Sequence, residues 1–375
     1  MCVKCVSMKA DKFKLKPSKR IAQVFEQTLN VCRELYNAGL QERRDAWKLN
    51  QVSINFHAQA TQLPAIKTIR EDVDALYSQV PQDALRRLSK AFDAFFRRVK
   101  AKQTAGFPRF KGLTRYNSFT YPQSGFSLSG GKLTLAKIGS VRLRLSRPVE
   151  GAIKTCTIKR EADGWYVIFT VEENSCRYIP QTGRSVGLDV GIESFATLST
   201  GGRIENPKYF RQAERRLKTA HRAVSRKKLR GSNRRKAIQL LAKQYLKIKR
   251  QRHDFFHKRS LDLLREFDAF IFEDLNIRGM MKNHHLAKSI ADAAWNTFLS
   301  IHTNKAENAG RVVRLVSAAF TSQDCSRCGD RVRKSLSQRE HRCLKCGFVA
   351  HRDVNAAINI KGRAYPLAMA ESAAR

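Results

Sequence analysis

Two closely spaced cysteine pairs constrain the fold of this chain more than any other feature. They are Cys325-x2-Cys328 and Cys343-x2-Cys346, with fourteen residues between the pairs. Four thiolates in two such turns can complete the tetrahedral shell of a zinc ion. Because a filled shell leaves no open position, the spacing predicts one structural Zn²⁺ and not a catalytic zinc. The zinc would hold a loop just before a second group of interest.

That second group consists of three acidic residues in separate contexts. Asp189 lies in SVGLDVGIE, Glu273 in FIFEDLN, and Asp353 in AHRDVNAAINI, seven residues beyond Cys346. A carboxylate inside an apolar strand is costly unless its charge is satisfied. Taken singly, Asp353 could be a helix N-cap and Glu273 a surface charge at a strand end. Together they predict ligands for Mg²⁺, and two ions about 4 Å apart could activate water and stabilise a leaving oxygen.

The charge of the chain points to a nucleic-acid partner. Its 375 residues include 72 lysines and arginines against 32 acidic residues, a formal net charge of +40. Such a chain repels itself unless a polyanion neutralises it, so we expect a long or folded nucleic acid and a phosphodiester substrate. The basic helices expected at 211–258 and 85–102 would contact phosphates. The leading candidates there are Arg215, Arg216, Arg226, Lys227, Lys228, Arg230, Arg234 and Arg235. The alternative is a solvated face.

Membrane and secretory signals are not expected. The sequence contains no run of 18 apolar residues, and the segment MCVKCVSMKADKFKLKP lacks a long apolar core. We therefore expect a cytoplasmic, nucleoid-associated protein with no membrane partner. CxxC pairs in a reducing compartment favour metal binding over disulfides. Cys2-x2-Cys5 has no second pair, so a metal site is not predicted there.

Hydrophobic periodicity divides the chain into three parts. A strand at 12–16 is followed by helices, one starting at Pro17-Ser18 and another near Pro81. The next part is rich in strands, with a hairpin at Gly130-Gly131, and predicts a small barrel into which the helical unit is inserted. Beyond residue 180, strands alternate with two basic helices and one amphipathic helix over 286–309, which indicates an α/β domain.

These segments resemble the TnpB family, the IS200/IS605 accessory proteins that are related to Cas12 nucleases. The most specific stretches are GLDVGIESFATLS, FEDLNIRGM, TSQDCSRCGD and HRCLKCGFVAHRDVNAAINI. The resemblance covers nearly the whole chain and implies a multidomain α+β architecture. A β-barrel wedge domain would comprise 1–17 and 105–180, with a helical recognition domain at 18–104. A RuvC-like RNase H nuclease domain would comprise 181–324 and 349–375, with a zinc ribbon at 325–348.

The resemblance also implies an activity, that of a metal-dependent, RNA-guided DNA endonuclease. Asp189, Glu273 and Asp353 match the catalytic triad of the family. The implied partners are a transposon-derived guide RNA, one protein per RNA, and target double-stranded DNA. The protein would read a short motif beside the target, and base pairing would read the rest.

Three other functions remain open from the sequence. A DNA transposase or recombinase would use the same acidic metal chemistry. An RNA-guided DNA-binding repressor would not cleave, although all three carboxylates are present. A plain zinc-ribbon DNA-binding protein would leave Asp189 and Glu273 unexplained.

Overall fold

A computed structural model describes residues 7–173, 179–335 and 338–364 of the chain. It contains two compact units, Met1–Ser175 and Cys176–Arg375, which are described separately below. Cys2, Cys5 and the segment after residue 364 lie outside the described residues. No helix within the described ranges has the length and apolar character needed to cross a membrane.

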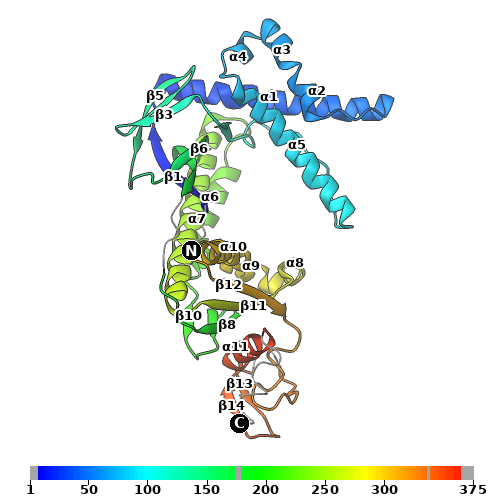
Figure 1. Cartoon of the computed structure of the whole chain (residues 1–375), viewed down its shortest axis with the longest axis vertical. Coiled ribbons are helices and arrows are strands. Elements are labelled where there is room, and N and C mark those ends of the chain that lie inside the picture. The colour runs from blue at the N-terminus through cyan, green and yellow to red at the C-terminus, as the bar shows by residue number, and fades with distance from the viewer. Residues whose placement is uncertain (1–6, 174–178, 336–337, 365–375) are drawn as a thin grey trace, which may run out of the picture. The chain divides into compact units, whose positions relative to one another are not determined.

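The first unit contains a seven-stranded antiparallel sheet (Figure 1). Its strands are β1 (Ser7–Lys16), β2 (Ser118–Tyr121), β3 (Phe126–Ser129), β4 (Lys132–Leu135), β5 (Gly139–Arg144), β6 (Ala152–Glu161) and β7 (Gly164–Glu173). The strand order is β2-β6-β7-β1-β5-β4-β3, so the early strand β1 does join the later ones. Among the described strands, β2 and β3 are the two edges and do not pair with each other, so closure into a barrel stays a prediction.

The hairpin between β3 and β4 forms where the sequence predicts it. Gly130 and Gly131 adopt φ values of 53° and 73°, the left-handed region that both central residues of a tight two-residue hairpin require. Ser129 pairs with Lys132 directly across this turn. The Gly-Gly signal is therefore confirmed by the backbone conformation.

Helices separate β1 from the rest of this sheet. They are α1 (Lys19–Asn50), α2 (Phe56–Ala60), α3 (Leu63–Ile69), α4 (Glu71–Asp74) and α5 (Gln79–Lys100). Ser18 caps α1 by accepting a hydrogen bond from the Ile21 backbone N–H, as its position predicts. The helices and the sheet share one hydrophobic core. The ring of Phe25 on α1 lies 5.7 Å from Phe119 and 5.0 Å from Trp165.

The second unit is built on a five-stranded sheet in the order β10-β9-β8-β11-β12. The strands are β8 (Ser185–Val190), β9 (Ser194–Leu198), β10 (Arg203–Glu205), β11 (Ala269–Asp274) and β12 (Val312–Ser317). Strands β8, β11 and β12 are parallel, whereas β9 and β10 are antiparallel to their neighbours. A small two-stranded sheet of β13 (Glu340–Arg342) and β14 (Val349–His351) flanks the second cysteine pair, and β14 leads directly into α11 (Arg352–Arg363).

Six helices in the described part of this unit surround the sheet or extend from it. They are α6 (Tyr209–Ser225), α7 (Ser232–Glu266), α8 (Ile277–Met280), α9 (His284–Ala293), α10 (Trp295–Asn308) and α11 (Arg352–Arg363). Aromatic packing joins α7 and α10 to the sheet, because the Phe195 ring of β9 lies 5.7 Å from Phe256 and 5.0 Å from Phe298. The two basic helices are joined near Gly231, as predicted.

The prediction of one helix over 286–309 is wrong, because the helix is interrupted at Ala294. This residue has φ 51° and ψ 44°, a left-handed conformation that ends α9 and precedes α10. In one continuous helix, Ile290 and Trp295 would point about 140° apart. The break instead allows both side chains to enter the same hydrophobic core. No glycine or proline marks this position in the sequence.

Candidate active site and zinc centre

Strand register places Asp189 and Glu273 side by side. In the parallel pair β8 and β11, Leu188 is opposite Phe272. Asp189 directly follows Leu188, and Glu273 directly follows Phe272. Leu188 and Phe272 both point into the hydrophobic core. Because side chains alternate along a strand, both carboxylates project from the opposite face.

Helix α11 covers that opposite face and carries Asp353. The contact is made at Gly187, where a Cβ atom would lie 2.1 Å from the Ala357 carbonyl oxygen and 2.7 Å from the Lys361 nitrogen. Asp189 is two residues beyond Gly187 on the same strand face, and Asp353 is one helical turn before Ala357. The bare glycine therefore lets the helix approach closely enough to bring Asp353 beside Asp189.

The electrostatics agree with this arrangement. Burial, together with the negative charges of Glu273 and Asp353, raises the pKa of Asp189 well above its usual value, and Arg352 opposes the shift. Burial also raises the pKa of Glu273, against the hydrogen bond from Thr321 and the charge of Arg363. These causes place Glu273 and Asp353 within electrostatic range of Asp189, and a role of the three carboxylates in Mg²⁺ binding stays a prediction.

The two single-residue alternatives are not supported. The N-cap of α11 is His351, whose Nδ1 accepts a hydrogen bond from the Asp353 backbone N–H at 3.2 Å. Asp353 therefore lies in the first turn and its carboxylate does not cap the helix. Its side chain is 20% exposed, which leaves it accessible to an ion. Glu273 is partly buried and hydrogen-bonded, unlike a free surface charge.

The four predicted zinc ligands meet at one point. Their sulfur atoms all lie within 4.8 Å of one another, with 3.7 Å between Cys325 and Cys346 and 3.6 Å between Cys328 and Cys343. Zn–S bonds of about 2.3 Å in a tetrahedron place the sulfurs about 3.8 Å apart. A hydrogen bond from the Cys346 backbone N–H lowers the pKa of the Cys343 thiol to about 7, toward the thiolate that binds metal. The residues fit a structural zinc ion.

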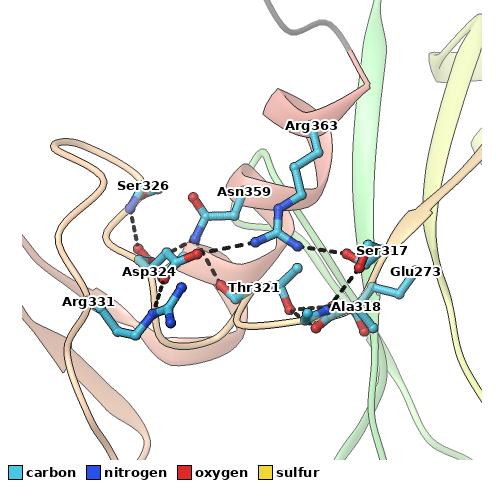
Figure 2. A network of polar contacts seen from close by, with 11 residues as sticks. Glu273, Ser317, Ala318, Thr321, Asp324, Ser326, Arg331, Asn359 and Arg363 are labelled. Atoms are coloured by element: carbon cyan, nitrogen blue, oxygen red, sulfur yellow. Dashed lines mark hydrogen bonds and ion pairs between the residues drawn. The ribbon is translucent and has the colours of Figure 1, made fainter.

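A hydrogen-bond network joins Glu273 to the segment that leads into the first cysteine pair (Figure 2). We call residues 317–326, which run from the end of β12 into the first cysteine pair, the linking loop. Thr321 Oγ1 in this loop donates to Glu273 Oε1 at 2.5 Å. Asn359 Nδ2 on α11 donates to the carbonyl oxygens of Thr321 and Asp324 at 2.8 and 2.7 Å. The helix that carries Asp353 thereby also fixes the loop that contacts Glu273.

Two further α11 side chains hold the same loop. Asn355 Nδ2 donates to the Asp324 carbonyl oxygen at 2.8 Å, and its Oδ1 accepts from the Ser326 N–H at 2.9 Å. Arg363 donates to the Ser317 carbonyl oxygen at 2.7 Å. Sequence reasoning missed these residues. A detectable signal existed, because Asn355, Asn359 and Arg363 recur every four residues on an otherwise apolar helix face.

The eight basic candidates lie on α6, on α7 and in the turn between them. Seven of them are exposed. Arg234 differs because it is partly buried and donates to the carbonyl oxygens of Val224 and Lys227 at 2.8 and 3.2 Å. Its guanidinium group serves the turn between the helices. A role for any of the eight in nucleic-acid contact stays a prediction.

Solved structures define the fold class. A chain from the cryo-EM structure of the Cas12f1-sgRNA-target DNA complex matches with a TM-score of 0.57 and 16% identity, over 92% of this chain and 83% of that one. The structure of the mini-RNA-guided endonuclease CRISPR-Cas_phi3 matches with a TM-score of 0.53 and 10% identity, over 95% and 92%. The chain thus has the mixed α/β fold of these compact Cas chains.

Sequence comparisons place the chain in its family. The family model described as "Probable transposase" matches residues 168–284, "Cas12f1-like, TNB domain" matches 295–360, and "Helix-turn-helix domain" matches 8–51. A Streptomyces pristinaespiralis protein named "Putative RNA-guided DNA endonuclease" is 37% identical over 94% of this chain and 88% of its own length. "Putative RNA-guided DNA endonuclease InsQ" of Escherichia coli K12 is 29% identical, over 94% and 91%. The chain belongs to the TnpB family.

Proposed function

We propose that this protein is an RNA-guided DNA endonuclease of the TnpB type that hydrolyses phosphodiesters with bound Mg²⁺. The observation that carries the proposal is the convergence of Asp189, Glu273 and Asp353 from two adjacent parallel strands and one helix. Relatives that match almost the whole chain carry the endonuclease name. The net charge of +40 suits a protein that holds RNA and DNA backbones.

The second unit would provide the chemistry as a RuvC-like nuclease of the RNase H type. Two Mg²⁺ ions, when bound, would activate water and stabilise the leaving 3′ oxygen. The protein's own contribution is to orient the three carboxylates. Arg352 favours ionisation of Asp189, and Thr321 favours ionisation of Glu273. The zinc ribbon would hold the linking loop in place.

The remaining parts would bind nucleic acid. The partners in this proposal are a transposon-derived guide RNA, one protein per RNA, and target double-stranded DNA in the cytoplasm. The sheet of the first unit would form the wedge domain, and α1 to α5 the recognition domain. The exposed cations of the α6–α7 turn would neutralise guide or heteroduplex phosphates, and base pairing would select the target.

The test is to sequence the RNA that copurifies with the protein and then to replace its 3′ guide segment. Cleavage should move to DNA that matches the new guide. Asp189→Ala, Glu273→Ala and Asp353→Ala should each reduce cleavage by about three orders of magnitude while guided binding persists. Asp274→Ala, at the exposed neighbour of Glu273, is the matched control and should cleave normally.

Two results would point to the alternatives. Strand-transfer products without guide dependence would identify a transposase. Guide-dependent DNA binding with no cleavage by wild-type protein in Mg²⁺ would identify a repressor.

A further inference from the structure

We propose that Thr321 is a positioning residue that fixes the Glu273 carboxylate for metal binding, and that Asn359 holds Thr321 in place. This inference rests on the proposed metal site. It assigns a role in the nuclease centre to the linking loop, in addition to its role as a connection to the zinc ligands.

The contact between Thr321 and Glu273 is short, protected and charge-assisted. Thr321 is only 2% exposed, so water does not compete for its hydroxyl group. Its Oγ1 lies 2.5 Å from Glu273 Oε1 and 3.3 Å from the Ala318 carbonyl oxygen. A hydroxyl has one proton to donate, and the shorter contact to a carboxylate is the stronger one. The hydroxyl is therefore committed to Glu273.

This hydrogen bond has one consequence for a cation. It fixes the rotation of the carboxylate at Oε1, which leaves Oε2 as the oxygen free of this contact for a metal ion. Thr321 thus orients the ligand.

The position of Thr321 is itself set by α11. Asn359 donates both of its amide hydrogen bonds to the linking loop, at the Thr321 and Asp324 carbonyl oxygens (Figure 2). Asn359 lies six residues after Asp353 on the same helix. One helix therefore presents one metal ligand directly and determines the orientation of another through a loop. A shift of α11 would disturb two of the three carboxylates together.

The experiment compares Thr321→Val, which removes the hydroxyl at nearly constant volume, with Thr321→Ser, which keeps it. Thr321→Val should weaken Mn²⁺ binding to the carboxylate site by about 10- to 100-fold, the usual effect of losing a partner that orients a metal ligand. Mn²⁺ affinity is measured by water-proton relaxation on zinc-loaded protein without DNA. Thr321→Ser should bind Mn²⁺ like wild type.

A second measurement is the Mg²⁺ dependence of guided cleavage. Thr321→Val should need more Mg²⁺ than wild type to reach half of its maximal rate, because the carboxylate of Glu273 is no longer held in place. High Mg²⁺ should restore part of the rate. Asn359→Ala should also weaken Mn²⁺ binding, by a smaller factor than Thr321→Val. This variant replaces Thr321→Val in the experiment if the valine variant does not fold.

Equal Mn²⁺ affinity and an unchanged Mg²⁺ dependence of cleavage in folded Thr321→Val would overturn the proposal. So would a serine variant that is as impaired as the valine variant, because that result would mean the methyl packing matters and the hydroxyl does not. The binding arm needs neither RNA nor cleavage. If wild type binds Mn²⁺ at the carboxylates but shows no guided cleavage, the proposed function fails while this inference is still tested.

Discussion

Helices α11 and α7 lie in the same unit but are held in very different ways. The short helix α11 presses its backbone onto β8 at Gly187 and is bonded to the linking loop by three polar side chains. Helix α7 is 35 residues long, yet its buried residues all lie from Ile248 onward. Its first half packs mainly along α6 and presents exposed cations.

Under the proposed function, the difference matches what each region would hold, which is metal ions near α11 and nucleic-acid phosphates along α7. Metal ligands must be placed to within a fraction of an ångström, which requires packing and hydrogen bonds around them. Phosphate neutralisation depends on the amount and location of charge and tolerates side-chain movement. Specific packing and hydrogen bonds are therefore concentrated on α11, whereas the part of α7 before Ile248 mainly presents exposed charge. The four predictions that follow test each side of this contrast.

The largest effect is expected from Gly187→Ala. The added methyl group would overlap the Ala357 carbonyl oxygen, which is backbone and cannot rotate away. Overpacking of this kind costs about 1 to 3 kcal/mol or displaces the helix. Either outcome should abolish cleavage, because α11 carries Asp353. Thermal unfolding and cleavage assays check this. Gly202→Ala, whose Cβ would meet no atom closer than 3.8 Å, is the control and should behave like wild type.

Loss of zinc should have the next largest effect. Cys325→Ser and Cys346→Ser each break the four-sulfur shell, so elemental analysis should show less than one zinc per chain. The linking loop contains both Cys325 and Thr321, so cleavage should fall together with zinc content. Ser326→Ala is the control, because its loop contact is made by the backbone N–H. Full cleavage by zinc-free protein would contradict the coupling between the two centres.

The other side of the contrast is tested on the α6–α7 turn. Replacement of Arg226, Lys227, Lys228 and Arg230 by Gln should reduce the slope of log affinity against log salt by about 3, or roughly 0.7 for each lost contact to single-stranded RNA. Guide-specified sequence preference should not change. RNA affinity is measured across a salt series. Arg234 is left intact because it supports the turn.

A matched control for this experiment is the double variant Arg259→Gln/Arg265→Gln. These two side chains lie at the inner end of α7 and pair with Asp262. The double variant should keep the wild-type slope. If the quadruple variant also keeps it, the charged turn is a solvated face and the RNA lies elsewhere.

The smallest effect concerns the stability of the metal-free protein. The pKa of Asp189 is raised in the folded state, so the folded protein binds more protons than the unfolded one above the ordinary Asp pKa, and stability is lost as pH rises. Asp189→Asn removes that charge. At neutral pH without Mg²⁺, it should therefore be more stable than wild type. Urea unfolding in a chelating buffer measures this, and a less stable Asn variant would contradict it.

Much of the local structure could be predicted from the sequence. The Ser18 cap, the Gly130-Gly131 hairpin and the helix after Asp353 each depend on neighbouring residues only. The four cysteines are predictable for the same reason, since their spacing within two short turns already defines a metal shell. These features need no knowledge of long-range packing.

The features that escaped prediction depend on contacts between distant segments. Ala294 takes a left-handed conformation because two buried residues on either side share one core, and an alanine carries no signal of that. In the sequence, Arg234 resembles any other surface charge, and its contacts with backbone carbonyl oxygens are evident only in the structure. Thr321 and Asn359 are ordinary polar residues in the sequence, and only the approach of α11 to the linking loop gives them a role.

The carboxylate of Asp292 joins the start of α6 to α7, and it is the point about which the outer part of α7 would pivot. Its carboxylate accepts from the Phe210 and Arg211 N–H groups at the start of α6 and from Arg252 of α7 at 2.7 Å. From Arg252 to Ser232, α7 extends for about 30 Å at 1.5 Å per residue. A rotation of roughly 5° at this pivot would move the far end of α7 by about 2 to 3 Å, close to the rise between successive nucleotides of one strand. Under the proposed function, this one buried carboxylate would limit the angular range of α7 and so which phosphate each cation of the turn could reach.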